Sequence, residues 1–102
     1  MRFKVEYNPD FFDDLAQAID WSNEKQTGLG DTFYKNASKQ TAKLSTTAMQ
    51  FVVRYDDIRC RNIEKIPYML HYHENPKTVK VEALFHTSRN PKIWSERTGY
   101  ET

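Results

Sequence analysis

The spacing of apolar residues changes near the middle of the chain, and this change restricts the folds that the chain can adopt. Between residues 11 and 44 apolar side chains recur every three or four positions, which is the period of an amphipathic helix. From residue 51 onward they mostly alternate with polar side chains, which is the period of a strand. Helices followed by a run of strands predict an α+β fold with an antiparallel sheet.

A strand and a helical hairpin are expected in the first half. Residues 2–7 alternate apolar with charged side chains, as a half-buried strand does. Asn8 and Pro9 then form a helix start, because asparagine is a favoured N-cap and proline fits the first turn. This helix is expected to end near Gln26. A short glycine-containing link leads to a second helix over residues 29–44, which predicts an antiparallel two-helix hairpin.

Three strands are expected in the second half, at residues 58–63, 68–73 and 78–86, with a short extended segment at 51–53. A regular ladder that matches apolar residues places Tyr72 opposite both Ile58 and Val79. The inner, helix-covered face then carries Ile58, Cys60, Leu70, Tyr72, Val79 and Val81. The outer face then carries Arg59, Arg61, Met69, His71, His73, Lys80, Glu82 and His86. A cationic outer face is therefore predicted.

A second Asn-Pro pair near the end of the chain predicts a short C-terminal helix. Asn90 and Pro91 repeat the helix-start signal, and this helix is expected to reach Arg97. The 102-residue length fits one domain, which we place at residues 1–97 with a frayed tail at 98–102.

Composition excludes several classes of protein. Aromatic residues make up 14% of the chain, which argues against disorder. No run approaches the roughly 18 apolar residues of a membrane span, and the early charges are unlike a secretory leader. One cysteine, Cys60, rules out an internal disulfide and fits a reducing cytoplasm. A net charge of +1 does not by itself indicate a nucleic-acid binder.

Two arginines are the first candidates for a functional site. Arg59 and Arg61 stand two residues apart on one predicted strand, so their side chains share a face. Guanidinium groups in this arrangement suit phosphates or the carboxylates of an acidic partner. The alternative is that both are ordinary surface charges paired with nearby glutamates.

The three histidines offer a second set of candidates. His71, His73 and His86 share one parity, and histidine exchanges protons near neutral pH, as RNA cleavage by a 2′-hydroxyl requires. A metal site would need a third ligand, for which Glu74 and Glu82 are the candidates. We expect neither a metal nor a cofactor. The alternative to an acid–base role is that the histidines are structural or ordinary surface residues.

Five segments in order resemble one family. These segments are DLAQAIDW, GLGDTF, VRYDDIRC, IPYMLHY and FHTSRNPKIW, and they span the chain from about Phe3 to Arg97. Together they resemble the RelE/ParE family of bacterial type II toxins, with an ending closer to the ParE-like branch. The resemblance implies a bacterial cytoplasmic protein that inhibits growth by binding DNA gyrase or the ribosome and is neutralised by a cognate antitoxin, with no small-molecule substrate.

One departure from the family pattern bears on whether the chain is an enzyme. Near the position where RelE-like nucleases carry a C-terminal tyrosine stands Trp94, which cannot exchange a proton near neutral pH. The residues left for a different catalytic set are His86, Arg89, Arg59 and Arg61. The residues expected to bind a target are Arg59, Arg61, His71, Lys80, Arg89 and Trp94. Two alternatives therefore stay open, a ribosome-dependent mRNA endonuclease and a non-toxic module that only docks its antitoxin.

Overall fold

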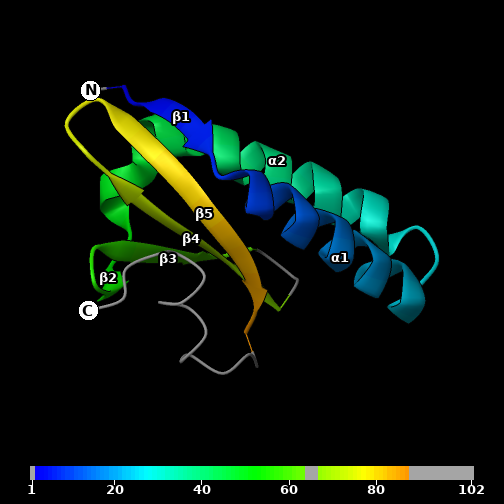
Figure 1. Ribbon diagram of the computed structural model, residues 1–102. Coiled ribbons are helices and arrows are strands. Elements are labelled where there is room, and N and C mark those ends of the chain that lie inside the picture. Colours follow the sequence, from blue (N-terminus) through cyan, green and yellow to red (C-terminus); the bar gives the residue numbers. More distant parts are fainter. Residues whose placement is uncertain (1, 64–66, 88–102) are drawn as a thin grey trace.

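The computed structural model describes residues 2–63 and 67–87 (Figure 1). The expected C-terminal helix and frayed tail, together with Arg89 and Trp94, lie outside the described residues. Within the described ranges no helix has both the length and the apolar character that crossing a membrane requires.

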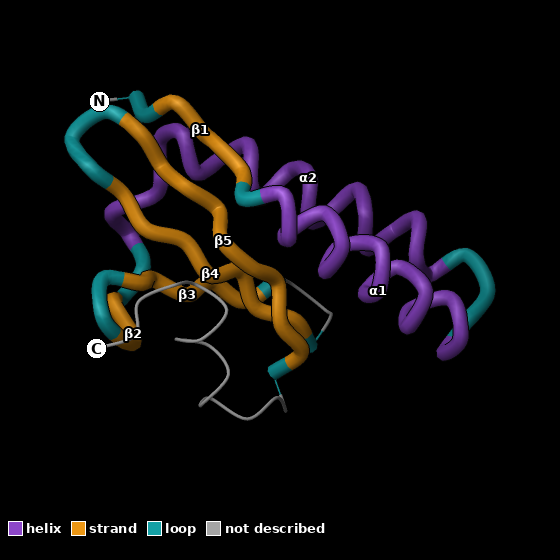
Figure 2. The backbone as a smooth tube through the Cα atoms, in the orientation of Figure 1, coloured by secondary structure: helices purple, strands orange, loops and turns teal. Residues whose placement is uncertain are grey.

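The order of elements confirms the predicted α+β class. Along the chain these are β1 (Lys4–Tyr7), α1 (Pro9–Lys25), α2 (Leu29–Thr47), the 3-10 turn η1 (Ala48–Gln50), β2 (Val53–Tyr55), β3 (Ile58–Asn62), β4 (Tyr68–Glu74) and β5 (Thr78–His86). The two helices lie side by side and cover one face of a five-stranded sheet (Figure 2).

Local signals fix the helical hairpin where the sequence predicts it. The Asn8 side chain accepts a hydrogen bond from the backbone N–H of Asp10 at 3.0 Å, and Pro9 occupies the first turn of α1. Between the helices Gly28 has a φ of 87°, a left-handed conformation that favours glycine. A side chain at Gly30 would lie 2.6 Å from the Asn23 amide, so glycine lets the two helices approach closely.

The sheet is mixed, which corrects the expectation of an antiparallel sheet. Its strand order is β1-β5-β4-β3-β2, and β1 runs parallel to β5 while all other neighbours are antiparallel. Alternation of apolar and polar residues is the same in both kinds of pairing, so the pattern carried no information on the direction of β1.

The pairing of β3 with β4 is one residue away from the prediction. Tyr72 pairs with Arg59, where the sequence predicted Ile58. Leu70 pairs with Arg61, where the sequence predicted Cys60. A shift of one residue turns every side chain of a strand to the other face. Arg59 and Arg61 therefore lie on the helix-side face of the sheet, and Ile58 and Cys60 on the outer face.

A β-bulge causes the second departure, between β4 and β5. Tyr72 pairs with Val81 but His71 pairs with Ala83, which leaves Glu82 as the extra residue. Up to Val81 the side chains of β5 lie on the predicted faces, although the residues of β4 that pair with this part do so two residues further along β5 than predicted. Beyond the bulge the parity reverses, so His86 pairs with Tyr68 and lies on the helix-side face, not on the outer face.

Apolar residues are buried on both faces of the sheet. The main cluster fills the space between helices and sheet and includes Phe33, Leu44, Leu70, Tyr72, Val79, Val81 and Leu84. Two smaller clusters on the outer face comprise Ile58, Cys60 and Met69 in one and Ala83 and Phe85 in the other, both packed against Tyr55. The prediction of a cationic outer face is therefore wrong where these two clusters cover β3, β4 and the end of β5.

Candidate functional site

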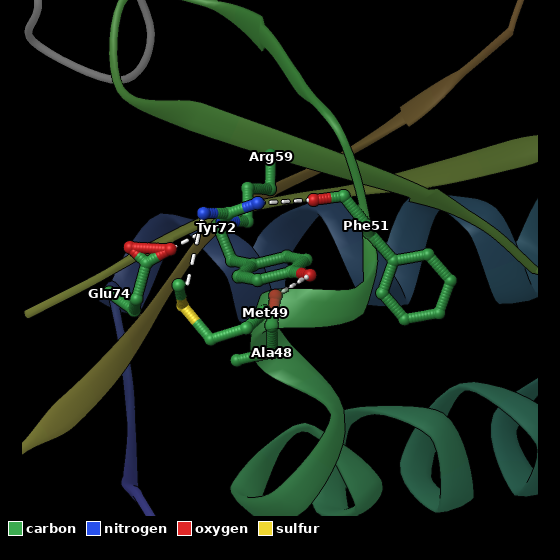
Figure 3. Close-up of polar contacts among 6 residues, drawn as sticks. All are labelled: Ala48, Met49, Phe51, Arg59, Tyr72 and Glu74. Carbon is green, nitrogen blue, oxygen red and sulfur yellow. Dashed lines mark hydrogen bonds and ion pairs between the residues drawn. The ribbon is translucent and has the colours of Figure 1, made fainter.

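Arg59 is held by three groups on the helix-side face. Its Nε donates to Glu74 Oε1, its Nη1 donates to the Phe51 carbonyl at 2.5 Å, and its Nη2 lies 3.8 Å from the sulfur of Met49 (Figure 3). The side chains of Arg59 and Glu74 are both only 16% exposed. We call these four residues the Arg59 cluster. This guanidinium serves the fold, because it anchors the connector between α2 and β2 to the sheet.

Tyr72 fixes the same connector at a second point. Its hydroxyl donates to the carbonyl of Ala48 at 2.8 Å inside the core (Figure 3). Burial raises the pKa of this hydroxyl well above its usual range, although the charge of Arg59 partly opposes the rise. The hydroxyl is therefore a permanent hydrogen-bond donor at any physiological pH.

Arg61 has a different environment from Arg59. Its guanidinium stacks on the ring of Phe51, 4.6 Å from the ring centroid, and its Nη1 is buried without a hydrogen-bond partner in the described part of the chain. It lines a pocket of about 400 Å³ at the β2–β3 edge of the sheet. The other lining residues are Gln50, Phe51, Val52, Arg54, Cys60 and Asn62. We call this the Arg61 pocket. Sequence reasoning missed Arg54, which comes from the neighbouring strand β2 and has no signal of its own.

His71 is fully buried on the outer face and is a structural residue. Its Nδ1 lies 2.9 Å from the hydroxyl of Tyr55 and 3.5 Å from the sulfur of Cys60, and its ring meets Phe85 edge-on at 5.0 Å. Burial raises the pKa of the Cys60 thiol to about 11, with partial opposition from the charge of Arg54. The thiolate is therefore scarce at neutral pH, and neither residue is placed to act on a substrate in solution.

A polar network at the bulge was not foreseen as a unit. Glu82 Oε2 lies 2.7 Å from His73 Nε2, and Glu82 Oε1 accepts from the Asn8 side chain at 2.9 Å. Burial raises the pKa of the Glu82 carboxyl, but the hydrogen bonds from His73 and Asn8 and nearby positive charge, including Lys80, outweigh it and hold the pKa below its usual value. The network joins the N-cap of α1 to β4 and β5. No sequence signal reports it, because Asn8 and Glu82 are 74 residues apart.

His86 belongs to a third region. Its ring lies edge-on to Trp21 at 5.1 Å and to Tyr68 at 5.2 Å. It lines a pocket of about 530 Å³ that also includes Asp14, Gln17 and Lys25 of α1. His86 and Arg61 therefore line different pockets, and the structure does not bring the predicted set of His86, Arg59 and Arg61 together.

An apolar groove follows the helical hairpin. It has a volume of about 290 Å³ and is lined by Tyr7, Phe11, Phe12, Leu15, Tyr34, Ala37, Ser38 and Thr41. Phe12 and Tyr34 are 53% and 49% exposed, which is high for large apolar side chains. Exposed apolar surface of this kind is typical of a protein–protein contact.

The candidate side chains of the described residues lie in separate places and do not converge on one pocket. Residues 2–63 and 67–87 contain no group of three histidine, cysteine or acidic side chains that could hold a metal ion. His73 lies beside Glu82, whereas the ring of His86 contacts Trp21, so these two histidines have partners in different parts of the structure.

Comparison with known proteins identifies the fold. No protein-family model and no curated protein matches the sequence. Among solved structures, the chain is similar to a chain of the chromosomal ParDE TA system from P. aeruginosa, with a TM-score of 0.74 and 12% sequence identity. The match covers 85% of this chain and 98% of that chain. The ParE-like α+β fold expected from the sequence is confirmed.

Proposed function

We propose that this chain is the toxin of a type II toxin–antitoxin module, which inhibits growth by binding a macromolecular target and is neutralised by a cognate antitoxin. The observation that carries the proposal is the likeness of fold to nearly the whole of a chain from a ParDE toxin–antitoxin system. The five sequence segments that resemble RelE/ParE toxins also support it, because they are a property of the sequence and not of the fold.

The distribution of polar groups favours binding over RNA cleavage. An endonuclease of RelE type would need an acid–base residue beside the cations that hold the phosphate. In the described part of the chain Arg59 is paired with Glu74, and His86 lines a different pocket from Arg61. We therefore propose that the chain acts by binding a bacterial target in the cytoplasm, either DNA gyrase or the ribosome. Inhibition by binding requires no further catalytic group.

The exposed apolar surface supports an antitoxin partner. We assign the groove at Phe12 and Tyr34 to the antitoxin, which we expect to be an amphipathic chain that folds on binding. Replacing both residues with serine is expected to keep the free protein soluble at higher concentration and to weaken rescue by the antitoxin. An unchanged rescue would contradict this assignment of the groove.

Induced expression in a bacterial host tests the function. We expect growth arrest, relief of the arrest by co-expression of the antitoxin gene adjacent to the toxin gene, and no new RNA 5′ ends inside translated codons. Cuts inside codons would instead make the chain a ribosome-dependent nuclease. Unimpaired growth at a confirmed protein level would identify a non-toxic module that only docks its antitoxin.

A further inference from the structure

The Arg61 pocket contains positive charge that no ion pair within the described residues neutralises. Among the described residues neither Arg54 nor Arg61 forms an ion pair, whereas Arg59 is paired with Glu74. The Nη1 atom of Arg61 is buried and has no acceptor within the described ranges. A buried donor without an acceptor destabilises a fold unless something else satisfies it. No acceptor in the described ranges satisfies this donor, so the pocket has the character of a site for a hydrogen-bond acceptor.

The guanidinium of Arg61 is held in place before any ligand arrives. It is half-buried, and it stacks 4.6 Å above the centroid of the Phe51 ring. The Phe51 ring points away from Arg59, which binds the Phe51 carbonyl (Figure 3). The two arginines therefore contact different parts of Phe51, the carbonyl and the ring. A stacked guanidinium loses little conformational freedom on binding, and its planar fork matches a carboxylate.

Arg54 adds a second charge on the same pocket. It is exposed and lines the pocket from β2, whereas Arg61 lines it from β3. Burial raises the pKa of the thiol of Cys60, another lining residue, and the positive charge of Arg54 partly opposes this rise, which agrees with its place at the pocket. The side chains of Gln50 and Asn62 supply further hydrogen-bonding groups at the rim.

The surroundings favour a peptide over a nucleic acid. Val52, which lines the pocket, and the next residue, Val53, are 71% and 44% exposed, so apolar surface adjoins the charge. A nucleic acid needs a row of cations along its phosphates, but Asp56 and Asp57 follow β2 directly. An acidic side chain with apolar neighbours matches both the charge and the valines.

We propose that the Arg61 pocket binds a carboxylate side chain of an acidic peptide segment in a protein partner, with Arg61 and Arg54 as the binding residues. Apolar side chains next to that carboxylate pack on Val52 and Val53. The proposal rests on the chemistry of the pocket and not on the toxin function, so each can fail without the other.

Fluorescence anisotropy with a defined peptide tests this site. The probe is a fluorescein-labelled decapeptide of alternating glutamate and valine, and its glutamine–valine counterpart is the uncharged control. Binding of the acidic peptide is expected to weaken about tenfold or more in Arg61→Met, which keeps the apolar stem, and about threefold in Arg54→Gln. Lys39→Gln removes one exposed charge from α2 and is expected to change nothing.

Several outcomes would overturn the proposal. These are equal affinity for the two peptides, no binding of the acidic peptide at about 1 mM, or equal weakening by Lys39→Gln and Arg61→Met. A single-stranded oligonucleotide that binds more tightly than the peptide, with the same dependence on Arg61, would assign the pocket to a nucleic acid instead.

Arg61→Lys keeps the charge without the planar fork of the guanidinium, and this variant is expected to bind the acidic peptide with intermediate affinity. Circular dichroism of each variant shows whether the fold is retained.

Discussion

Arg59 and Arg61 share one strand and one face of the sheet, yet within the described residues only Arg59 of the two forms an ion pair. Arg59 contacts Glu74, the Phe51 carbonyl and Met49, whereas Arg61 contacts the Phe51 ring and has a buried nitrogen without an acceptor in the described residues. The difference comes from what lies opposite and beside each residue. Residue type and spacing therefore do not distinguish a structural arginine from a binding one. The distinction comes from the residues of the neighbouring strand and of the connector that contact each guanidinium.

The largest expected effect is the loss of the Arg59 cluster. Arg59→Met leaves the Glu74 carboxylate with 16% exposure and no cation, and it releases the connector at Phe51. The free energy of unfolding is expected to fall by about 2–4 kcal/mol, as measured by urea denaturation. A loss no greater than that of Lys39→Gln would show that the cluster does not support the fold.

Tyr72→Phe probes the second anchor of the same connector. Removal of the hydroxyl leaves the buried Ala48 carbonyl without its donor, so a loss of about 1–2 kcal/mol is expected. Tyr34→Phe is the matched control, because the Tyr34 side chain is about half exposed. Equal unfolding free energies for the two variants would contradict the role given to Tyr72.

Glu82→Gln tests the network that Glu82 forms with His73 and Asn8, for comparison with the Arg59 cluster. Its effect on the free energy of unfolding is expected to depend on pH. The pKa of Glu82 is lower in the folded state, so the carboxylate stabilises the fold above its ordinary pKa of 4.5 and loses this effect as the pH falls through the folded pKa. The variant should be less stable than the parent by about 1 kcal/mol near neutral pH, and the gap should close in acid. Chemical denaturation at a series of pH values measures this gap. A gap that widens below pH 4.5, or the same profile for the exposed control Glu24→Gln, would contradict it.

The smallest effect on stability is expected for Arg61→Met. Arg61 forms no ion pair among the described residues, and the loss of its stack on Phe51 is opposed by the removal of a buried donor without an acceptor. The free energy of unfolding of the variant should therefore stay within about 0.5 kcal/mol of the parent value. Thermal and urea unfolding of the variant beside Arg59→Met give the direct contrast. A loss as large as that of Arg59→Met would mean that Arg61 also serves the fold.

The helical hairpin was predictable because its signals are local. Asn8 and Pro9 begin α1 where the sequence places a cap, and Gly28 adopts a left-handed conformation in the link directly before α2. Each signal acts within one or two turns of chain. No distant residue is needed to read it.

The register of the strands was not predictable by matching apolar residues. That method assumes that one face of the sheet is buried and the other is polar. Here Ile58 and Phe85 are buried on the outer face as well, so a shift of one residue along β3 keeps apolar neighbours together. The bulge at Glu82 then moves His86 to the helix-side face, and nothing in the alternation marks the extra residue.

The candidate site was therefore predicted only in part. Arg61 was selected for its residue type, and the pocket that it lines depends on Arg54 and on the connector at Phe51. These residues meet through the β2–β3 pairing, in which the register itself shifts. A site built from irregular pairing and a connector leaves no periodic pattern in the sequence.

The nuclear magnetic resonance spectrum of the arginine side-chain Nε–H groups tests the contrast between the two arginines most directly. The spectrum is recorded with and without the glutamate–valine peptide. The Arg59 signal should exchange slowly with water and keep its position, because its Nε–H is bonded to Glu74. The Arg61 signal should move as the peptide is added. A moving Arg59 signal beside an unchanged Arg61 signal would reverse the roles assigned to them.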